Sequence, residues 1–425
     1  MQEFLIVGGG IFGVSTAYHL ALRVSDPSRI TLLDRFPAPS VLAASTDINK
    51  IIRADYSNPL YMTLGLEAID AWKNLPFFKE AGVYHQTGWV SMNEKHNDTP
   101  HRIRKNYHDN NMNNAITEMT EQDVRIGWNG FLRHADCRPF SSYYFNPLAG
   151  WANAGDALAV LTQEAIKLGV NYQIGEASHI LLGDDGVNGL ETRDGRVFHA
   201  DKVLLATGAW TSQLMSSLED EMSLDEDDRV ERQISAAGVC VAHFNLSEPE
   251  GKAYSDLPVI VYGGQGEIIP PTKAGILKFT FSTSFKNTIR TPYGHAISAP
   301  ADDQSASPPK LQEDAISKIK HRLPQILEND RKPDYYRICW DSISPSQHPL
   351  ITRHPDDRVP NLYLAVGGSF HCYKFLPTIG KYVTNVLLGI SNGNEKDQAW
   401  GWKDVHETRG VHESLRPTKE WRDFI

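Results

Sequence analysis

The sequence has few cysteines, no surplus of basic residues and no long membrane-type apolar run. Its 425 residues include four cysteines, none in a C-x-x-C pair, so neither a disulfide framework nor a structural zinc site is expected. Asp and Glu (52) outnumber Lys and Arg (42), and the net charge of −10 argues against nucleic acid as a partner. The main block of acids, residues 219–228, is predicted to be a solvated surface loop. The signatures of zinc proteases, α/β-hydrolases and P-loop proteins are also missing.

One apolar segment, residues 4–22, could pass for a signal peptide or a short membrane span. Glycines and polar side chains interrupt it, and no basic segment precedes it, so neither is predicted. The chain ends in D-F-I, which differs from the S-K-L type of peroxisomal signal. We therefore expect a cytoplasmic protein of a reducing compartment, without a membrane partner.

The start of the chain has the pattern of a dinucleotide-binding unit. Phe4–Val7 is a short apolar run typical of a strand buried in a parallel sheet, and Val14–Leu22 has helical spacing. Between them, Gly8, Gly10 and Gly13 form G-x-G-x-x-G. Such glycines let the backbone approach a pyrophosphate at the N-terminus of the helix, so this turn is a candidate phosphate site.

An acidic residue at a suitable interval strengthens this prediction. A second strand, Ile30–Leu33, ends on Asp34, roughly 20 residues after Gly13, where a carboxylate can bind the ribose hydroxyls of an adenosine. Glycines that serve only tight strand–helix packing are the alternative, but they explain neither the second strand nor the acid. We therefore predict a dinucleotide site.

Two later features favour FAD over NAD. The strand Val203–Leu205 runs into A-T-G at residues 206–208, as in the returning strand of many FAD-binding folds. A helix over Ala157–Leu168 and a strand over Val170–Ile174 form a second βαβ-like element. The A-T-G sequence alone could be an ordinary strand exit, but together with the N-terminal unit it predicts FAD.

Motifs near both ends of the chain carry a family resemblance. Cys339-Trp340 is followed by Pro345, and G-G-S-F-H-C-Y-K-F at residues 367–375 leads into P-x-I-G at residues 377–380. Near the front, residues 47–53 read D-I-N-K-I-I-R. On these residues, the chain resembles the sarcosine oxidase, fructosyl-amino-acid oxidase (amadoriase) and pipecolate or saccharopine oxidase family of FAD-dependent amine oxidases.

The resemblance implies a fold that combines α/β and α+β parts. We expect a Rossmann-like FAD-binding domain formed by residues 1–85, 141–229 and 325–425. An interleaved substrate domain on a mixed or antiparallel sheet would contain residues 86–140 and 230–324. The family members act on small molecules, and we expect a monomer.

The activity implied is oxidation of the C–N bond of a secondary amino acid to an imine, with reduction of O2 to H2O2. Three alternatives stay open: a dehydrogenase with another electron acceptor, a biosynthetic oxidase whose imine cyclises, and a non-catalytic flavin-binding protein. The family's cation and cysteine positions are intact here, which argues against the last of these.

Cys339 matches the family cysteine that bonds covalently to the methyl carbon at position 8 of the flavin ring. A bound thioether withdraws electrons and raises the flavin potential, which suits amine oxidation. The alternative is a small buried core cysteine. Cys372 occupies a glycine position of the family pattern and is predicted to be a packing residue, and Cys137 and Cys240 have no comparable context.

Four cations match functional positions of the family. Lys374 and Arg53 correspond to the pair that holds the substrate carboxylate, for which a bidentate Arg and a point-charged Lys are suited. Lys278, on an alternating apolar strand, corresponds to the lysine that assists oxygen reduction, and Lys50 is expected on the same flavin face. For each of them, a solvated surface charge is the alternative.

Four positions concern the flavin and the substrate. His371 takes the place of a family histidine near the pyrimidine end of the flavin, with a core histidine as the alternative. Asp341 is typical of amadoriases and would bind a polar or cationic extension on the substrate nitrogen. Phe370 and Cys372 replace family glycines, so the pocket should be reshaped and the identity of the substrate is left open.

The complete set of predicted cofactor-binding residues is Gly8, Gly10, Ile11, Phe12, Gly13, Asp34, Ser45, Thr46, Lys50, Val170, Ala206, Thr207, Gly208, Trp210, Cys339, Gly368, Phe370, His371 and Lys374.

Overall fold

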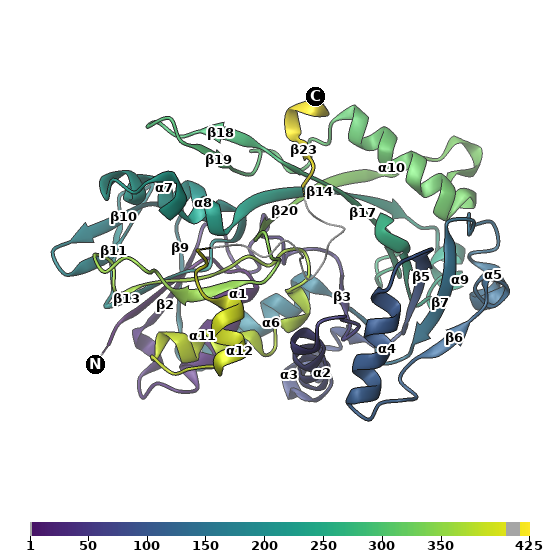
Figure 1. Ribbon diagram of the computed structural model, residues 1–425, viewed down its shortest axis with the longest axis horizontal. Coiled ribbons are helices and arrows are strands. Elements are labelled where there is room, and N and C mark those ends of the chain that lie inside the picture. The colour runs from purple at the N-terminus through teal and green to yellow at the C-terminus, as the bar shows by residue number, and fades with distance from the viewer. Residues whose placement is uncertain (1, 405–416) are drawn as a thin grey trace.

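Two large sheets organise the computed structural model, which describes residues 2–404 and 417–425 (Figure 1). The first sheet has six strands in the order β21-β22-β13-β1-β2-β9. They span Phe4–Val7 (β1), Ile30–Asp34 (β2), Asn171–Ile174 (β9), Lys202–Leu205 (β13), Leu350–Arg353 (β21) and Leu362–Val366 (β22). The strands are parallel except for β21, and β1 and β22 are buried along their whole length, as expected for a sheet covered on both faces.

Helices and a small sheet cover the two faces of this sheet. One face packs against α1 (Ile11–Ala21), α6 (Ala154–Lys167) and α11 (Ile379–Leu387). The other packs against α7 (Thr211–Glu221) and against a three-stranded sheet of β10 (Ala177–Gly183), β11 (Gly186–Thr192) and β12 (Val197–His199). This arrangement is the predicted Rossmann-like layer structure.

Glycines permit the close packing of α1. A Cβ atom on Gly13 would lie 1.8 Å from the carbonyl oxygen of Gly8, so only glycine lets this helix approach the first strand. A Cβ atom on Gly380 of α11 would lie 2.0 Å from the carbonyl oxygen of Ser15 in α1. The third glycine of G-x-G-x-x-G and the glycine of P-x-I-G are therefore packing positions.

The second sheet has nine strands, mostly antiparallel, in the order β20-β14-β17-β16-β15-β5-β7-β6, with β23 beside β17. They span Trp89–Glu94 (β5), Thr117–Met119 (β6), Phe140–Asn146 (β7), Ser235–Asn245 (β14), Val259–Tyr262 (β15), Glu267–Ile269 (β16), Ile276–Lys286 (β17), Tyr335–Ile343 (β20) and Lys419–Glu420 (β23). Helix α10 (Pro309–Arg322) packs on this sheet through Ala315 and Ile319. The long strands β14, β17 and β20 extend across the molecule toward the first sheet (Figure 1).

In the part of the chain that the structure describes, the remaining elements are seven α-helices and two small sheets. The helices are α2 (Pro59–Asn74), α3 (Pro76–Ala81), α4 (Thr99–Asp109), α5 (Glu121–Gly130), α8 (Val230–Gln233), α9 (Glu248–Ala253) and α12 (Asn394–Trp400). The strands β3 (Lys50–Ile52), β4 (Tyr84–His85) and β8 (Gly150–Ala152) form one small sheet, and β18 (Thr288–Arg290) pairs with β19 (Ala296–Ser298). Within the described ranges, no helix is long and apolar enough to cross a membrane.

The predicted fold class is confirmed, but three strands lie in a different sheet from the one that the predicted division implies. Strands β7 (from residue 141 on), β20 and β23 fall in the predicted FAD-binding segments, and all three belong to the nine-stranded sheet. Strand β20 pairs with β14 from Ser235↔Ile343 to His243↔Tyr335, a ladder between distant segments that local sequence does not reveal. Apart from these strands, the domain division stays a prediction.

The acidic block at residues 219–228 is not wholly a solvated loop. Its first three residues continue helix α7, where Glu219 and Asp220 are buried beside Arg229. The Arg229 guanidinium lies 2.7 Å from Asp220 and 3.8 Å from Glu219. The buried guanidinium of Arg229 therefore stabilises these two acidic side chains inside the protein, which the prediction of a solvated loop did not foresee.

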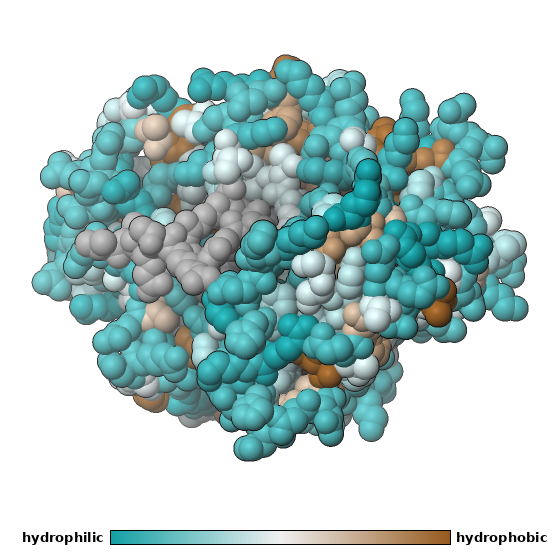
Figure 2. All heavy atoms as spheres, turned by 45° about the vertical axis from the view of Figure 1, so that its right-hand side comes forward, coloured by the Kyte–Doolittle hydropathy of each residue, from teal (hydrophilic) through white to brown (hydrophobic). Residues whose placement is uncertain are grey.

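One outer face of the molecule, shown in Figure 2, is mostly hydrophilic, with hydrophobic residues in small separate patches.

Candidate active site

A large cavity lies between the two sheets and contacts both of them. Its volume is about 1050 Å³, and its walls include Gly8 and Asp34 of the first sheet and Lys278 and Cys339 of the second. Pockets for small ligands and cofactors commonly occupy such a junction between layers. Most of the predicted site residues meet in this one space, although they come from segments hundreds of positions apart.

The nucleotide end of the cavity is formed by the carboxyl ends of β1, β2 and β13. Asp34 accepts hydrogen bonds from the backbone N–H of Gly9 (2.7 Å) and of Phe36 (3.0 Å), which fix its carboxylate at the cavity wall. Gly8 has φ +109°, and a Cβ atom there would lie 2.4 Å from the carbonyl oxygen of Ala206. This glycine-dependent turn thus brings the backbone against the cavity.

Most of the predicted cofactor residues line this cavity, namely Gly8, Gly10, Ile11, Phe12, Asp34, Ser45, Lys50, Ala206, Thr207, Gly208, Trp210, Cys339, Gly368, Phe370, His371 and Lys374. Gly13 and Thr46 lie beside it: Gly13 packs α1 on β1, and the Thr46 carbonyl accepts a hydrogen bond from Arg337.

The structure does not support Val170 as a cofactor residue. Val170 precedes strand β9 and is buried in the apolar core under the sheet. Residues 175–178, which follow the same strand, line the cavity instead. Ligands bind beyond the carboxyl ends of parallel strands. The residues after the predicted strand were therefore better candidates for cofactor binding than Val170 at its start.

Cys339 projects into the cavity from strand β20. The residue is 3% exposed, and its sulfur lies 3.8 Å from the Lys50 ammonium and 4.0 Å from the carbonyl oxygen of Ala44. Asp341, two positions along the same strand, also lines the cavity and accepts hydrogen bonds from the backbone N–H of Ser342 (2.9 Å) and of Phe370 (2.8 Å). Burial raises the pKa of Asp341, although these two bonds offset part of the effect.

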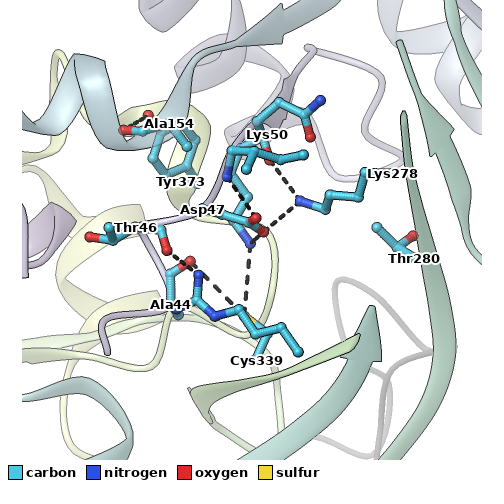
Figure 3. A network of polar contacts seen from close by, with 12 residues as sticks. Ala44, Thr46, Asp47, Lys50, Ala154, Lys278, Thr280, Cys339 and Tyr373 are labelled. Atoms are coloured by element: carbon cyan, nitrogen blue, oxygen red, sulfur yellow. Dashed lines mark hydrogen bonds and ion pairs between the residues drawn. The ribbon is translucent and has the colours of Figure 1, made fainter. Parts of the chain in front are cut away.

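Lys278 and Lys50 share one carboxylate, that of Asp47 (Figure 3). The Lys278 ammonium donates to Asp47 Oδ2 at 2.5 Å and to the carbonyl oxygen of Asn49 at 2.8 Å, and Lys50 Nζ lies 3.2 Å from the same Oδ2. Lys278 is 1% exposed, so the surface-charge alternative is wrong for this residue. Burial lowers the pKa of Lys278 to about 8, and the attraction of Asp47 opposes that shift.

Asp47 was not among the predicted site residues. Burial alone would raise its pKa, but the Lys278 and Lys50 ammoniums hold that pKa well below the usual range, so Asp47 is a carboxylate. The sequence D-I-N-K places Asp47 three residues before Lys50, and this spacing could have indicated an ion pair between them. The partner lysine on β17 could be found only from the folded chain.

A second cation site, formed by Lys374 and Arg53, is also buried. Lys374 is 4% exposed and donates hydrogen bonds to the Tyr56 hydroxyl (2.9 Å) and to the carbonyl oxygen of His371. No carboxylate in the described part of the chain lies within ion-pair distance of Lys374 Nζ. Arg53 is 7% exposed, with its guanidinium 4.5 Å from the Tyr56 ring centre and 5.0 Å from that of Trp89. Both cations are therefore inside the protein, and the surface-charge alternative is wrong for them too.

His371 and Tyr56 continue the hydrogen-bond network of Lys374. The His371 Nε2 atom lies 2.8 Å from the carbonyl oxygen of Gln347, which can only accept, so Nε2 carries the proton. Its Nδ1 atom then accepts from the Tyr56 hydroxyl at 3.0 Å. Burial, together with the Lys374 ammonium, lowers the pKa of His371 well below its usual value, which keeps the ring neutral. Tyr56 was missed by sequence reasoning.

Phe370 adopts a glycine-like backbone beside this network. Its φ is +60°, and that of Ser369 is +47°, both in the left-handed region that side chains disfavour. Phe370 lines the cavity, as its replacement of a family glycine led us to expect, whereas Cys372 is buried in the apolar core.

A family model described as FAD dependent oxidoreductase (DAO) matches residues 3–386. The chain belongs to this family. This DAO-family member is 30% identical to the L-saccharopine oxidase of Schizosaccharomyces pombe, over 95% of this chain and 93% of that protein. Among solved structures, it is similar to the fructosamine oxidase (amadoriase II) of Aspergillus fumigatus, with a TM-score of 0.81 and 26% identity, covering 100% of this chain and 96% of that chain. A modified fructosyl peptide oxidase from Aspergillus nidulans gives a TM-score of 0.85 and 28% identity, covering 100% and 99%.

The protein is an FAD-dependent oxidoreductase, and the cavity between the two sheets fits FAD. Asp34 and the Gly8 turn suit the adenosine and pyrophosphate, and the distant end of the cavity, with Cys339 and the buried cations, suits the flavin ring. The predicted family resemblance and the predicted FAD are confirmed.

Proposed function

We propose that this protein is an FAD-dependent oxidase of a secondary amino acid with a large nitrogen substituent. One observation carries the proposal: Lys374 is a buried lysine that faces the cavity without a carboxylate at ion-pair distance in the described chain, and burial lowers the pKa of its ammonium well below the ordinary value. Buried charges require a partner, so a substrate carboxylate is the natural counter-ion. Arg53 beside it would supply a second, planar donor.

Each residue has a distinct task in this proposal. Lys374 and Arg53 bind the α-carboxylate and fix the substrate in one pose, which places the C–H bond for transfer. Bound FAD supplies the two-electron acceptor. The carbon–nitrogen bond loses two electrons and two protons and becomes an imine, which water hydrolyses, and O2 takes up the two electrons and two protons as H2O2. Lys278 and Lys50 place positive charge where O2 gains its first electron.

We propose that the FAD is bound covalently through Cys339. The thiol is buried, faces the cavity and lies 3.8 Å from the Lys50 ammonium. Joining the sulfur to the flavin methyl carbon releases two protons and two electrons, which O2 can accept.

The relatives support the substrate class but not one substrate. One relative is named a saccharopine oxidase and similar structures are named fructosyl peptide oxidases, and both names denote a substrate with a large group on its amino nitrogen. Phe370 lines the cavity at a position where the sugar-specific pattern has glycine. We therefore propose no sugar as the nitrogen substituent of this chain's substrate. The Asp341 carboxyl is placed to accept hydrogen bonds from a polar substituent.

A peroxide-coupled assay tests the function. The panel is saccharopine, pipecolate, fructosyl-lysine and sarcosine, each beside its carboxamide. We expect one carboxylate to give peroxide and to bleach the flavin anaerobically, and its amide to do neither at the same concentration. Bleaching without peroxide would identify a dehydrogenase, and no bleaching by any secondary amino acid would refute the proposal. Cytoplasmic location and monomeric state stay predictions.

A further inference from the structure

Asp47 is a buried carboxylate in the cavity region that has no task in the function proposed above. Its side chain is 2% exposed and contacts two lysines from different strands, Lys278 of β17 and Lys50 of β3 (Figure 3). The same oxygen, Oδ2, lies 2.5 Å from Lys278 Nζ and 3.2 Å from Lys50 Nζ. One anion therefore serves two cations.

The segment that carries Asp47 is fixed to strand β20. Arg337 of β20 donates hydrogen bonds to the carbonyl oxygens of Thr46, of Ala43 (3.1 Å) and of Val41 (3.3 Å). These contacts hold the loop before β3 against the sheet that carries Lys278. The position of Asp47 is thus built into the fold.

Few other titratable groups face this cluster. Besides the two lysines, they are Arg337, Cys339 and Asp341 of β20, His243 of β14, Tyr335 and Tyr373. His243 is neutral because burial lowers its pKa to about 4, and it stacks on Tyr335 at 4.2 Å. Asp341 faces Lys50, but among the described residues Asp47 is the carboxylate within ion-pair distance of both lysines.

We propose that Asp47 is a positioning residue for the oxygen reaction, because its one carboxylate fixes both lysines and cancels one of their two charges. The inference rests on the proposed oxidase function. Without Asp47, two ammoniums would share a buried site, and such like charges disfavour each other. Lys278 would then lose its proton at a lower pH and would no longer be held toward the cavity.

Reoxidation of the reduced flavin gives the first test and needs no amine substrate. The holoenzyme is reduced with dithionite, mixed with O2 in a stopped-flow instrument and followed at the oxidised-flavin band across pH. We expect the wild-type rate to fall as pH rises through about 8, the pKa of Lys278. In Asp47→Asn, the fall should move at least about one pH unit toward acid, and Asp47→Glu should restore most of the shift.

The second readout is the titration of Lys278 itself. In holoenzyme labelled with ¹³C at the lysine Cε, the Lys278 signal is assigned by its loss in Lys278→Met. We expect this signal to titrate near pH 8 in wild type and at least about one unit lower in Asp47→Asn. This measurement reports charge at Lys278 and does not depend on turnover.

Lys50→Met is the matched variant, because it removes the like charge and keeps the carboxylate. Its pH profile of reoxidation should move toward higher pH, opposite to that of Asp47→Asn. If Asp47→Asn does not fold, the direction of this shift in Lys50→Met tests the inference. The double variant Asp47→Asn/Lys278→Met should reoxidise no more slowly than Lys278→Met. Unchanged profiles, or losses that multiply in the double variant, would overturn the inference. Inactivity toward every amine would instead refute only the proposed function.

Discussion

Removal of the Lys374 ammonium is the most direct test of the substrate site. Lys374→Met keeps the length of the aliphatic chain and deletes the charge that donates to Tyr56 and to the carbonyl oxygen of His371. The site is 4% exposed, so water cannot replace the lost donor. A substrate carboxylate would then be buried with one of its two cations missing.

The size of the effect follows from this burial. Truncating one partner of a buried charge pair costs about 2–5 kcal/mol, most of it the penalty of leaving the other charge without its partner. At about 1.4 kcal/mol per factor of ten, the half-saturation constant for flavin reduction should rise roughly 30-fold to several thousand-fold. Arg53 should set the residual affinity.

The assay is anaerobic flavin reduction by the active substrate and by its carboxamide. Wild type should lose affinity for the amide to a similar extent, and Lys374→Met should lose little more when given the amide. Lys381→Met is a suitable control, because Lys381 is 43% exposed at its side chain, pairs with Glu67 and does not line the cavity. If the losses from mutation and from amide substitution simply multiply, Lys374 does not contact the carboxylate and the assignment is wrong.

Three further outcomes are expected. Acid denaturation should leave the yellow colour on the wild-type chain and release it from Cys339→Ala, and complete release from wild type would contradict the thioether. Lys278→Met should slow reoxidation by orders of magnitude, since a preorganised charge is worth about 3–4 kcal/mol. Anaerobic reduction of the flavin by substrate should stay within about a few-fold of the wild-type rate. The reverse pattern would assign Lys278 to substrate binding. Burial raises the pKa of Glu219 to about 7, against an ordinary value of 4.5, so the folded state retains a proton that the unfolded state has already released in this window. The free energy of unfolding should therefore fall as pH rises from about 4.5 to 7. Glu219→Gln should be more stable than wild type at pH 8, by up to about 3 kcal/mol, and nearly as stable as wild type at pH 4. Equal pH slopes of the two proteins in denaturant titrations would refute this.

Much of the nucleotide end was predictable, because its signals are local. The strand, glycine turn, helix and second strand lie within the first 34 residues, and the structure has them as β1, α1 and β2. The steric demands of Gly8 and Gly13 are set by immediate neighbours in the turn, so the spacing of glycines is sufficient to identify them. The apolar strand ending in A-T-G is β13, which pairs with β1 in parallel.

The fate of single charged residues was decided by tertiary contacts. Sequence alone gave Lys278 two possible environments, and the pairing of β17 with its neighbours placed it in the interior. Glu219 was predicted to be solvated, yet Arg229 and the Val230 backbone enclose it. Val170 was assigned to the cofactor, but the direction of β9 turns the opposite end of that strand toward the cavity.

The amino-acid sequence by itself determined the cofactor class, the family and the chemical types present at the site. The tertiary structure alone decided which of them meet: Asp47 with Lys278 across 231 positions, and Tyr56 with His371 across 315. The physical reason is that glycine turns and strand periodicity depend on neighbours a few residues away, whereas a buried ion pair depends on strand register and loop closure over the whole chain.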